Sequence, residues 1–283
     1  MLNMNLNLSS KDLTTLDHLE LDTGLQILNI HDNKLRVIDK LSTLTNLVNL
    51  GIECNIISNI SVLSTLTNLR ELHMSFNSIS NIDCLESLCN LSVLYLYCNK
   101  IEKIKGISLC TNLSKLSLAG NKIVDVIYIS NLTNLSTLYL DNNYIKEVDI
   151  LSKLTNLRIL SLNNNYIKEV DTLSTLVKLK NLNISQNSIK QIDKLLVLTN
   201  LTSIDFDTPP IKDIKKYLIQ RNMMIQWQNV HPKFLKYCLA IAPLDLPVLI
   251  QIHIFNFNSY DNHRYKKWQI AKSIKNLYQK KLI

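Results

Sequence analysis

The chain has 283 residues, of which 46% are apolar and 19% charged, with only four glycines and five prolines. This length suffices for one large domain or two ordinary ones, each with a sizeable core. The sequence shows no secretory signal, no membrane-spanning apolar run and no paired CxxC cysteines, so we expect a cytoplasmic protein with reduced thiols.

Charge is distributed unevenly along the chain. Residues 1–208 hold 18 Lys+Arg and 20 Asp+Glu, whereas residues 209–283 hold 13 Lys+Arg and three Asp+Glu. The net charge of +8 therefore comes from the C-terminal quarter. Such an asymmetry indicates a separate segment with its own electrostatic preference.

A 22-residue repeat organises the chain from its beginning. A partial copy comes first, in which Leu6 and Leu8 stand in phase with Leu28 and Ile30, and Lys11 takes the place of an asparagine. An atypical polar first turn is expected at the open end of a solenoid core.

Eight complete repeats follow without an insertion or deletion. Their clearest mark is an asparagine every 22 residues: Asn33, Asn55, Asn77, Asn99, Asn121, Asn143, Asn165 and Asn187. A fixed period of this length is the signature of a solenoid.

Each repeat predicts one short β-strand, followed by an irregular segment that leads back to the start of the next strand. The alternation Leu-x-Leu places two side chains on one face of a strand and the residue between them on the other. The apolar positions that follow are spaced by three residues, which suits a 3₁₀-like path better than a full α-helix.

The repeated asparagine has a predicted structural role. Where the chain leaves the strand, backbone N–H and C=O groups lose their partners, and a buried unpaired group costs about 1–3 kcal/mol. An amide side chain offers both donors and an acceptor, so we expect it to bind backbone groups of its own turn and of the next turn.

The repeat pattern is LxxLxLxxNxIxxIxxLxxLTN, and it covers residues 6–208. It resembles the leucine-rich repeat family, in particular the 22-residue class of the protein-phosphatase-1 regulatory subunit and of internalin-type repeats. The resemblance implies an α/β solenoid: a right-handed arc with a parallel β-sheet on the concave face and a 3₁₀ or irregular convex side.

The ninth repeat is degenerate, because Pro209 stands where the asparagine is expected. Proline supplies no donor and interrupts a strand ladder. We therefore predict two parts, a solenoid over 1–208 and a basic, mainly helical cap over 209–283.

The solenoid geometry predicts which side chains point out of the concave sheet. Adjacent parallel strands lie about 4.8 Å apart, so Tyr95 and Tyr139 should lie about 10 Å apart with Ser117 between them. Exposed tyrosines on such a face are typical of protein interfaces. The predicted partner-binding residues are Tyr95, Tyr97 and Tyr139, with His73, Glu71, Glu53 and Asp141 as a polar rim.

No arrangement of residues indicates catalysis. The four glycines are scattered, so a phosphate-binding loop is not expected, and no nucleophile–base pair is visible. His31 and His73 lack a third ligand nearby, so no metal or other cofactor is expected. The predicted function is a monomeric, non-catalytic scaffold that binds a partner protein on its concave face.

The C-terminal segment leaves two alternatives open. Lysines recur along residues 262–283 beside Tyr265 and Trp268, a pattern that could bind nucleic acid or an anionic membrane. The apolar run that begins at Leu246-Pro247 could instead recruit ubiquitin-ligase machinery, which would make the chain an adaptor.

Overall fold

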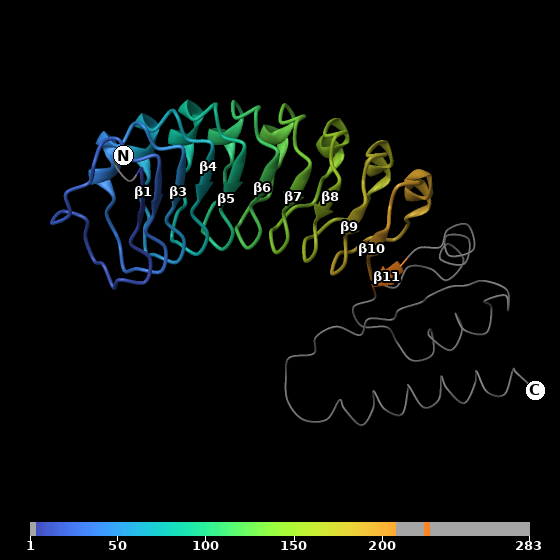
Figure 1. Ribbon diagram of the computed structural model, residues 1–283. Helices are drawn as coiled ribbons and strands as arrows, with labels where there is room; N and C mark the ends of the chain where they lie inside the picture. The colour runs from blue at the N-terminus through green and yellow to red at the C-terminus, as the bar shows by residue number, and fades with distance from the viewer. Residues whose placement is uncertain (1–3, 208–223, 227–283) are drawn as a thin grey trace, which may run out of the picture.

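The computed structural model describes residues 4–207 and 224–226, which form one sheet of eleven parallel strands in chain order (Figure 1). Successive strands are neighbours throughout the sheet. The strands are β1 Asn5–Asn7, β2 Ile27–Asn29, β3 Asn49–Gly51, β4 Glu71–His73, β5 Val93–Tyr95, β6 Lys115–Ser117, β7 Thr137–Tyr139, β8 Ile159–Ser161, β9 Asn181–Asn183, β10 Ser203–Asp205 and β11 Met224–Gln226.

The register of the sheet repeats the period of the sequence. Leu72 pairs with Leu94, and Leu94 pairs with Leu116, so each residue meets the one 22 positions further on. Because the side-chain period of a strand is two, a constant register places equivalent residues of all repeats in continuous rows. The predicted solenoid with a parallel concave sheet is confirmed.

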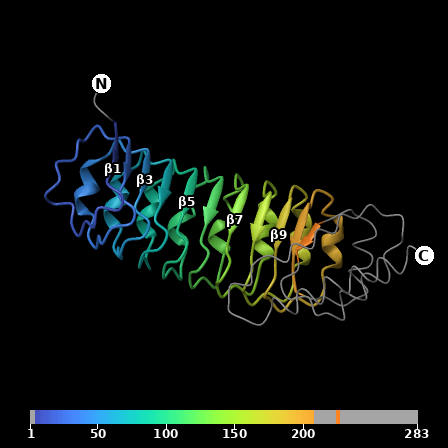
Figure 2. The ribbon, with the colours of Figure 1, turned by 60° about the horizontal axis from the view of Figure 1, so that its bottom comes forward.

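Short 3₁₀ segments form a second row beside the strands (Figure 2). In η2 (Ser61–Thr65) and the turn after it, Leu63, Leu66 and Leu69 each donate a backbone N–H to the carbonyl of the residue three positions earlier. Three residues per turn keep all of these leucines on the inner face, as their spacing predicts. The segments are η1 Asp39–Thr43, η2 Ser61–Thr65, η3 Asp83–Ser87, η4 Lys105–Ile107, η5 Ile127–Ile129, η6 Asp149–Lys153, η7 Asp171–Thr175 and η8 Asp193–Val197.

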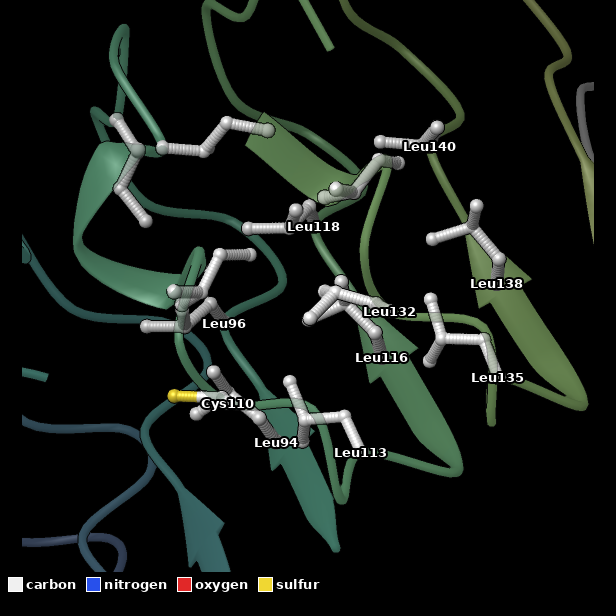
Figure 3. Packing of buried hydrophobic residues seen from close by; sticks show 14 of the residues in the cluster. Leu94, Leu96, Cys110, Leu113, Leu116, Leu118, Leu132, Leu135, Leu138 and Leu140 are labelled. Carbon is white, nitrogen blue, oxygen red and sulfur yellow. The ribbon is translucent and has the colours of Figure 1, made fainter. Parts of the chain in front are cut away.

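The core is a continuous column of leucine and isoleucine between the two rows. Leu94, Leu116 and Leu138 point inward from successive strands and are fully buried (Figure 3). Cys110 takes a leucine position in the same cluster and is also fully buried. Each repeat packs against its neighbours, so the burial of each coil depends on the next coil.

The repeated asparagine joins two coils. The amide nitrogen of Asn165 donates to the carbonyls of Leu162, at 3.0 Å, and of Leu140 in the preceding repeat, also at 3.0 Å. Its carbonyl oxygen accepts the N–H of Ile145 at 3.0 Å. The prediction that this side chain binds the next coil is wrong, because its partners outside its own turn lie in the preceding coil. One side chain still satisfies buried backbone groups of two coils.

A second asparagine ladder runs along the outside of the turn that leads into each strand. Asn68 and Asn90 each donate a side-chain hydrogen bond of 2.9 Å to a carbonyl 23 residues earlier, on Thr45 and Thr67 respectively. In the seventh repeat Lys178 takes this place and donates to the side-chain oxygen of Asn156 at 2.7 Å. The sequence carried this signal in its repeated Thr-Asn-Leu, but its inter-repeat role becomes visible only in the structure.

The ladder asparagines are the eight from Asn33 to Asn187 that join successive coils. The residue before each of them adopts a left-handed backbone conformation. Gly120, with φ of 65°, suits this geometry, and Asn142 and Asn164 tolerate it. Cys54 and Phe76 adopt it as well, with φ of 52° and 55°. For such residues this conformation costs roughly 1–2 kcal/mol, so the surrounding repeats impose the turn on them.

The sheet has one strand more than the sequence predicts. β11 pairs in parallel with β10, with Ser203 opposite Met224, a spacing of 21 residues instead of 22. Within the predicted helical cap over 209–283, residues 224–226 are described, and they form a strand of the solenoid sheet. The rest of this cap, including its lysine-rich stretch and the Leu246-Pro247 run, lies outside the described residues. The boundary at 208/209 stays a prediction. Where the chain is described, no helix is long and apolar enough to cross a membrane.

Replacing a ladder asparagine by alanine should lower the free energy of unfolding much more than replacing an exposed asparagine. Asn165→Ala should lower the free energy of unfolding by about 2–3 kcal/mol, because it leaves buried backbone groups without partners. Asn131→Ala, at an exposed position of the convex side, should change it by less than about 0.5 kcal/mol. Urea unfolding followed by circular dichroism measures both, and equal effects would contradict the structural role of the ladder.

The backbone at Gly106 in η4 packs closely against the preceding coil, so a larger residue at this position should destabilise the fold. A Cβ atom there would lie 1.9 Å from the carbonyl oxygen of Ile82, which cannot move without shifting the preceding coil. Gly106→Ala should therefore lower the free energy of unfolding by about 1–3 kcal/mol. Gly24→Ala is the control, because its Cβ would meet only the Asp22 side chain, at 3.2 Å. Thermal unfolding that is unchanged in Gly106→Ala would contradict this packing.

Candidate protein-binding surface on the concave face

Three rows of side chains point out of the concave sheet. They come from the first and third residues of each strand and from the second residue after it, because side chains alternate along a strand. In the third complete repeat these residues are Glu71, His73 and Ser75. Leu72 and Met74 between them are fully buried, and Ser75 is itself largely covered. The predicted partner-binding residues all belong to these rows.

The predicted tyrosines lie on or just after two strands of the sheet that are separated by one strand. Tyr95 on β5 pairs with Ser117 on β6, which pairs in turn with Tyr139 on β7. Both tyrosines are half-buried, and Tyr97 is exposed. The sheet thus places the three rings on one face, with a small serine between two of them.

A carboxylate–histidine cluster lies beside Tyr95. Nδ1 of His73 is 3.4 Å from Oε1 of Glu53, and its Nε2 is 3.7 Å from Oε2 of Glu71. Glu71 also accepts a hydrogen bond of 2.8 Å from the Asn49 amide. The contact with Glu53 raises the pKa of His73, Glu71 raises it further, and partial burial opposes both.

Tyr95 and Gly51 lie on the two sides of His73 in this cluster. The Tyr95 ring meets His73 edge to face, with ring centroids 5.0 Å apart and an angle of 79° between the rings. On the other side His73 pairs with Gly51, where a Cβ atom would lie 3.2 Å from Oε2 of Glu53. The absence of a side chain at this position therefore lets the Glu53 carboxylate lie across the sheet toward His73.

An exposed aromatic pair extends the surface to the ends of the strands. The rings of Phe76 and Tyr97 are 4.9 Å apart and nearly perpendicular, at 87°. Phe76 is 49% exposed, and it is one of the residues held in the left-handed conformation. Sequence reasoning missed Phe76, although its place directly before a ladder asparagine was a usable signal.

Asp141 lies within a polar network of the sheet. Its carboxylate accepts hydrogen bonds from the hydroxyl of Ser161 and from the N–H of Asn163, at 3.2 Å for the latter. Asn163 continues the network by donating to the Ser185 hydroxyl at 2.7 Å. Burial raises the pKa of Asp141, whereas these hydrogen bonds oppose the rise. Asp141 therefore binds the adjacent coil, and Asn163 extends the network to a third coil. A role of Asp141 in partner binding stays a prediction.

A second pair of tyrosines lies beyond the concave rows, directly after two ladder asparagines. Tyr144 and Tyr166 are 47% and 55% exposed, and their rings stack with centroids 6.1 Å apart. Their repeats share the run Asn-Asn-Tyr-Ile-Lys-Glu-Val-Asp, so the register brings identical residues together. This pair was not predicted from the sequence.

The described residues contain no group of three or more His, Cys, Asp or Glu side chains that could hold a metal ion. Cys54, Cys84, Cys89, Cys98 and Cys110 are free thiols. Burial raises the pKa of Cys84 to about 11 and that of Cys110 to about 12, so both thiols stay protonated at neutral pH.

The fold, the asparagine ladder and the repeat register define a leucine-rich repeat protein of the 22-residue class. A family model described as "Leucine Rich repeats (2 copies)" matches residues 67–109, 111–153 and 133–175. No curated protein sequence matches the chain.

Solved structures of similar chains come from bacteria and plants. An internalin, InlF, from Listeria monocytogenes is 26% identical with a TM-score of 0.56, over 82% of this chain and 83% of that one. Internalin C2 from the same species is 27% identical with a TM-score of 0.64, over 65% and 81%. The plant peptide hormone receptor RGFR1 in complex with RGF2 shares the fold at 24% identity and a TM-score of 0.60, over 74% of this chain and 36% of that one.

The raised pKa of His73 predicts a pH-dependent stability. A group whose pKa is raised in the folded state stabilises it fully below the unfolded value, here 6.5, and this contribution is lost as pH rises through the folded pKa. The free energy of unfolding should therefore fall above pH 6.5 in the wild type. The fall should be smaller in His73→Gln and in Glu53→Gln, because each substitution removes one member of the pair.

Urea unfolding at several pH values on both sides of 6.5 measures this slope. A His73→Gln protein with the same slope as the wild type would contradict the proposed electrostatic contact.

Proposed function

We propose that this chain is a non-catalytic scaffold that binds a partner protein through its concave face, around Tyr95, Tyr97 and Tyr139. Leucine-rich repeat proteins commonly serve as protein-interaction scaffolds, and the fold family is typically non-enzymatic. The observation that carries the proposal is the placement of these rings and of His73 on one face of the sheet, within the four successive strands β4 to β7 and the turn after β5.

The chemistry of this face supports protein binding. Tyrosines bury a large area at a small cost in conformational entropy, because only two side-chain torsions become fixed. Glu53 and Glu71 lie beside the rings, and charged groups at the margin of an interface favour one partner over others. The proposal keeps the cytoplasmic location predicted from the sequence, where the free thiols of the described residues would stay reduced.

The test is partner capture by the full chain and by the variant Tyr95→Ala/Tyr97→Ala/Tyr139→Ala. Removing three clustered tyrosines should weaken binding at least about a hundredfold, because interface tyrosines often contribute 1–2 kcal/mol or more each. The melting temperature should change little, since these side chains lie outside the leucine core. A partner captured from a lysate is then purified and titrated by calorimetry against both proteins.

The matched control is Tyr128→Ala/Tyr144→Ala/Tyr166→Ala, which removes three exposed tyrosines outside the concave rows. It should bind the purified partner as the wild type does. Equal binding by the concave-face variant would refute the proposal. If that binding also fell steeply with salt, the basic segment 209–283 would become the favoured site.

A further inference from the structure

The Glu53–His73–Glu71 cluster has carboxylate oxygens with unused acceptor capacity. The distances from His73 to Glu53 and Glu71, 3.4 and 3.7 Å, are longer than a normal N–H···O hydrogen bond. Nε2 of His73 is covered from solvent and makes no hydrogen bond within the described residues. The side chains of Glu53 and Glu71 are 28% and 45% exposed, so an approaching group can reach both.

The charges of the cluster do not balance. Two carboxylates face a single imidazole, so the net charge is −1 when His73 is protonated and −2 when it is neutral. Over residues 4–207, no lysine or arginine forms an ion pair with either glutamate. Lys115 lies two strands away from Glu71, about 10 Å across the sheet. The face therefore presents a local excess of negative charge.

Apolar surface adjoins this negative charge. The Tyr95 ring packs on His73, and the exposed Phe76–Tyr97 pair lies toward the ends of the same strands. Four of the equivalent turns place Gly120, Asp32, Asn142 or Asn164 in the left-handed position, where those residues fit more easily than phenylalanine. The large ring of Phe76 at this position of the third complete repeat widens the exposed aromatic surface beside the cluster.

We propose that this part of the concave face recognises a partner segment that carries an arginine or lysine close to an aromatic or aliphatic residue. The cationic group would lie between Glu53 and Glu71, and the apolar side chain would pack on Phe76 and Tyr97. This inference rests on the proposed protein-binding function and adds the chemistry of the partner. Charge complementarity supplies the occupant, because two partly exposed carboxylates without a lysine or arginine partner match one guanidinium or ammonium group.

His73 adjusts the strength of this recognition. The groups that face it are Glu53 after β3, Glu71 on its own strand and Tyr95 on β5. When His73 loses its proton, the second negative charge of the cluster is uncompensated. A cationic segment should then bind more tightly at a pH above the pKa of His73 than below it.

The test is selection of a random-peptide display library on the full chain at neutral pH. Enriched peptides should carry a basic residue near an aromatic or aliphatic one. Synthetic copies should bind the variant Glu53→Gln/Glu71→Gln about tenfold more weakly than the wild type, with a smaller difference at high salt. The matched control, Glu147→Gln/Glu169→Gln, removes two exposed glutamates outside the concave rows and should bind as the wild type does.

The outcomes separate this inference from the broader proposal. Enriched peptides that lack a basic residue, or equal affinity for the wild type and Glu53→Gln/Glu71→Gln, would overturn the inference. If such peptides still lose binding in the Tyr95→Ala/Tyr97→Ala/Tyr139→Ala variant, the scaffold function stands. A library that yields no enriched peptide on the wild type also counts against the inference, because the site is an open surface that a short segment can reach.

Discussion

Each coil of this solenoid leaves backbone N–H and C=O groups where its strand ends, and one asparagine amide per repeat binds such groups in two coils. Asn165 illustrates the arrangement, with carbonyls of its own turn and of the preceding repeat at 3.0 Å. An unsatisfied buried group costs about 1–3 kcal/mol, so this requirement recurs at every coil. The asparagine recurs once in each 22-residue coil, in step with the constant register of the sheet.

The constant register separates structural from recognition residues. Inward positions are restricted to leucine, isoleucine and similar residues, because each coil packs on two others. The outward rows carry no such restriction, and they differ from repeat to repeat. Glu53, His73 and Tyr95 therefore meet in space although 20 or 22 residues separate one from the next. The scaffold brings distant residues together without any loop having to fold over them.

Some outward residues nevertheless stabilise the scaffold. Asp141 binds Ser161 and Asn163 in the next coil, and Glu71 accepts a hydrogen bond from Asn49 in the coil before. Position in a row therefore does not distinguish a side chain that is free to bind a partner from one that binds its neighbours. The contrast between Asp141, tied to the adjacent coil, and Glu53, which keeps acceptor capacity, is the distinction on which the proposed recognition depends.

Periodicity along the chain was enough to predict the repeat, the parallel sheet and the 3₁₀ segments. It also predicted the rows to which Tyr95, Tyr97 and Tyr139 belong. These predictions follow from the pattern of apolar residues. Alternating apolar residues indicate a strand, three-residue spacing indicates a 3₁₀ segment, and a constant 22-residue period indicates coils that stack and bury one continuous core. Only the tertiary structure decided which side chains touch across coils: the ion pairs of His73, the Phe76–Tyr97 pair and the network of Asp141. Such contacts depend on side-chain orientation and on the backbone conformation before each ladder asparagine, and neither follows from spacing along the chain.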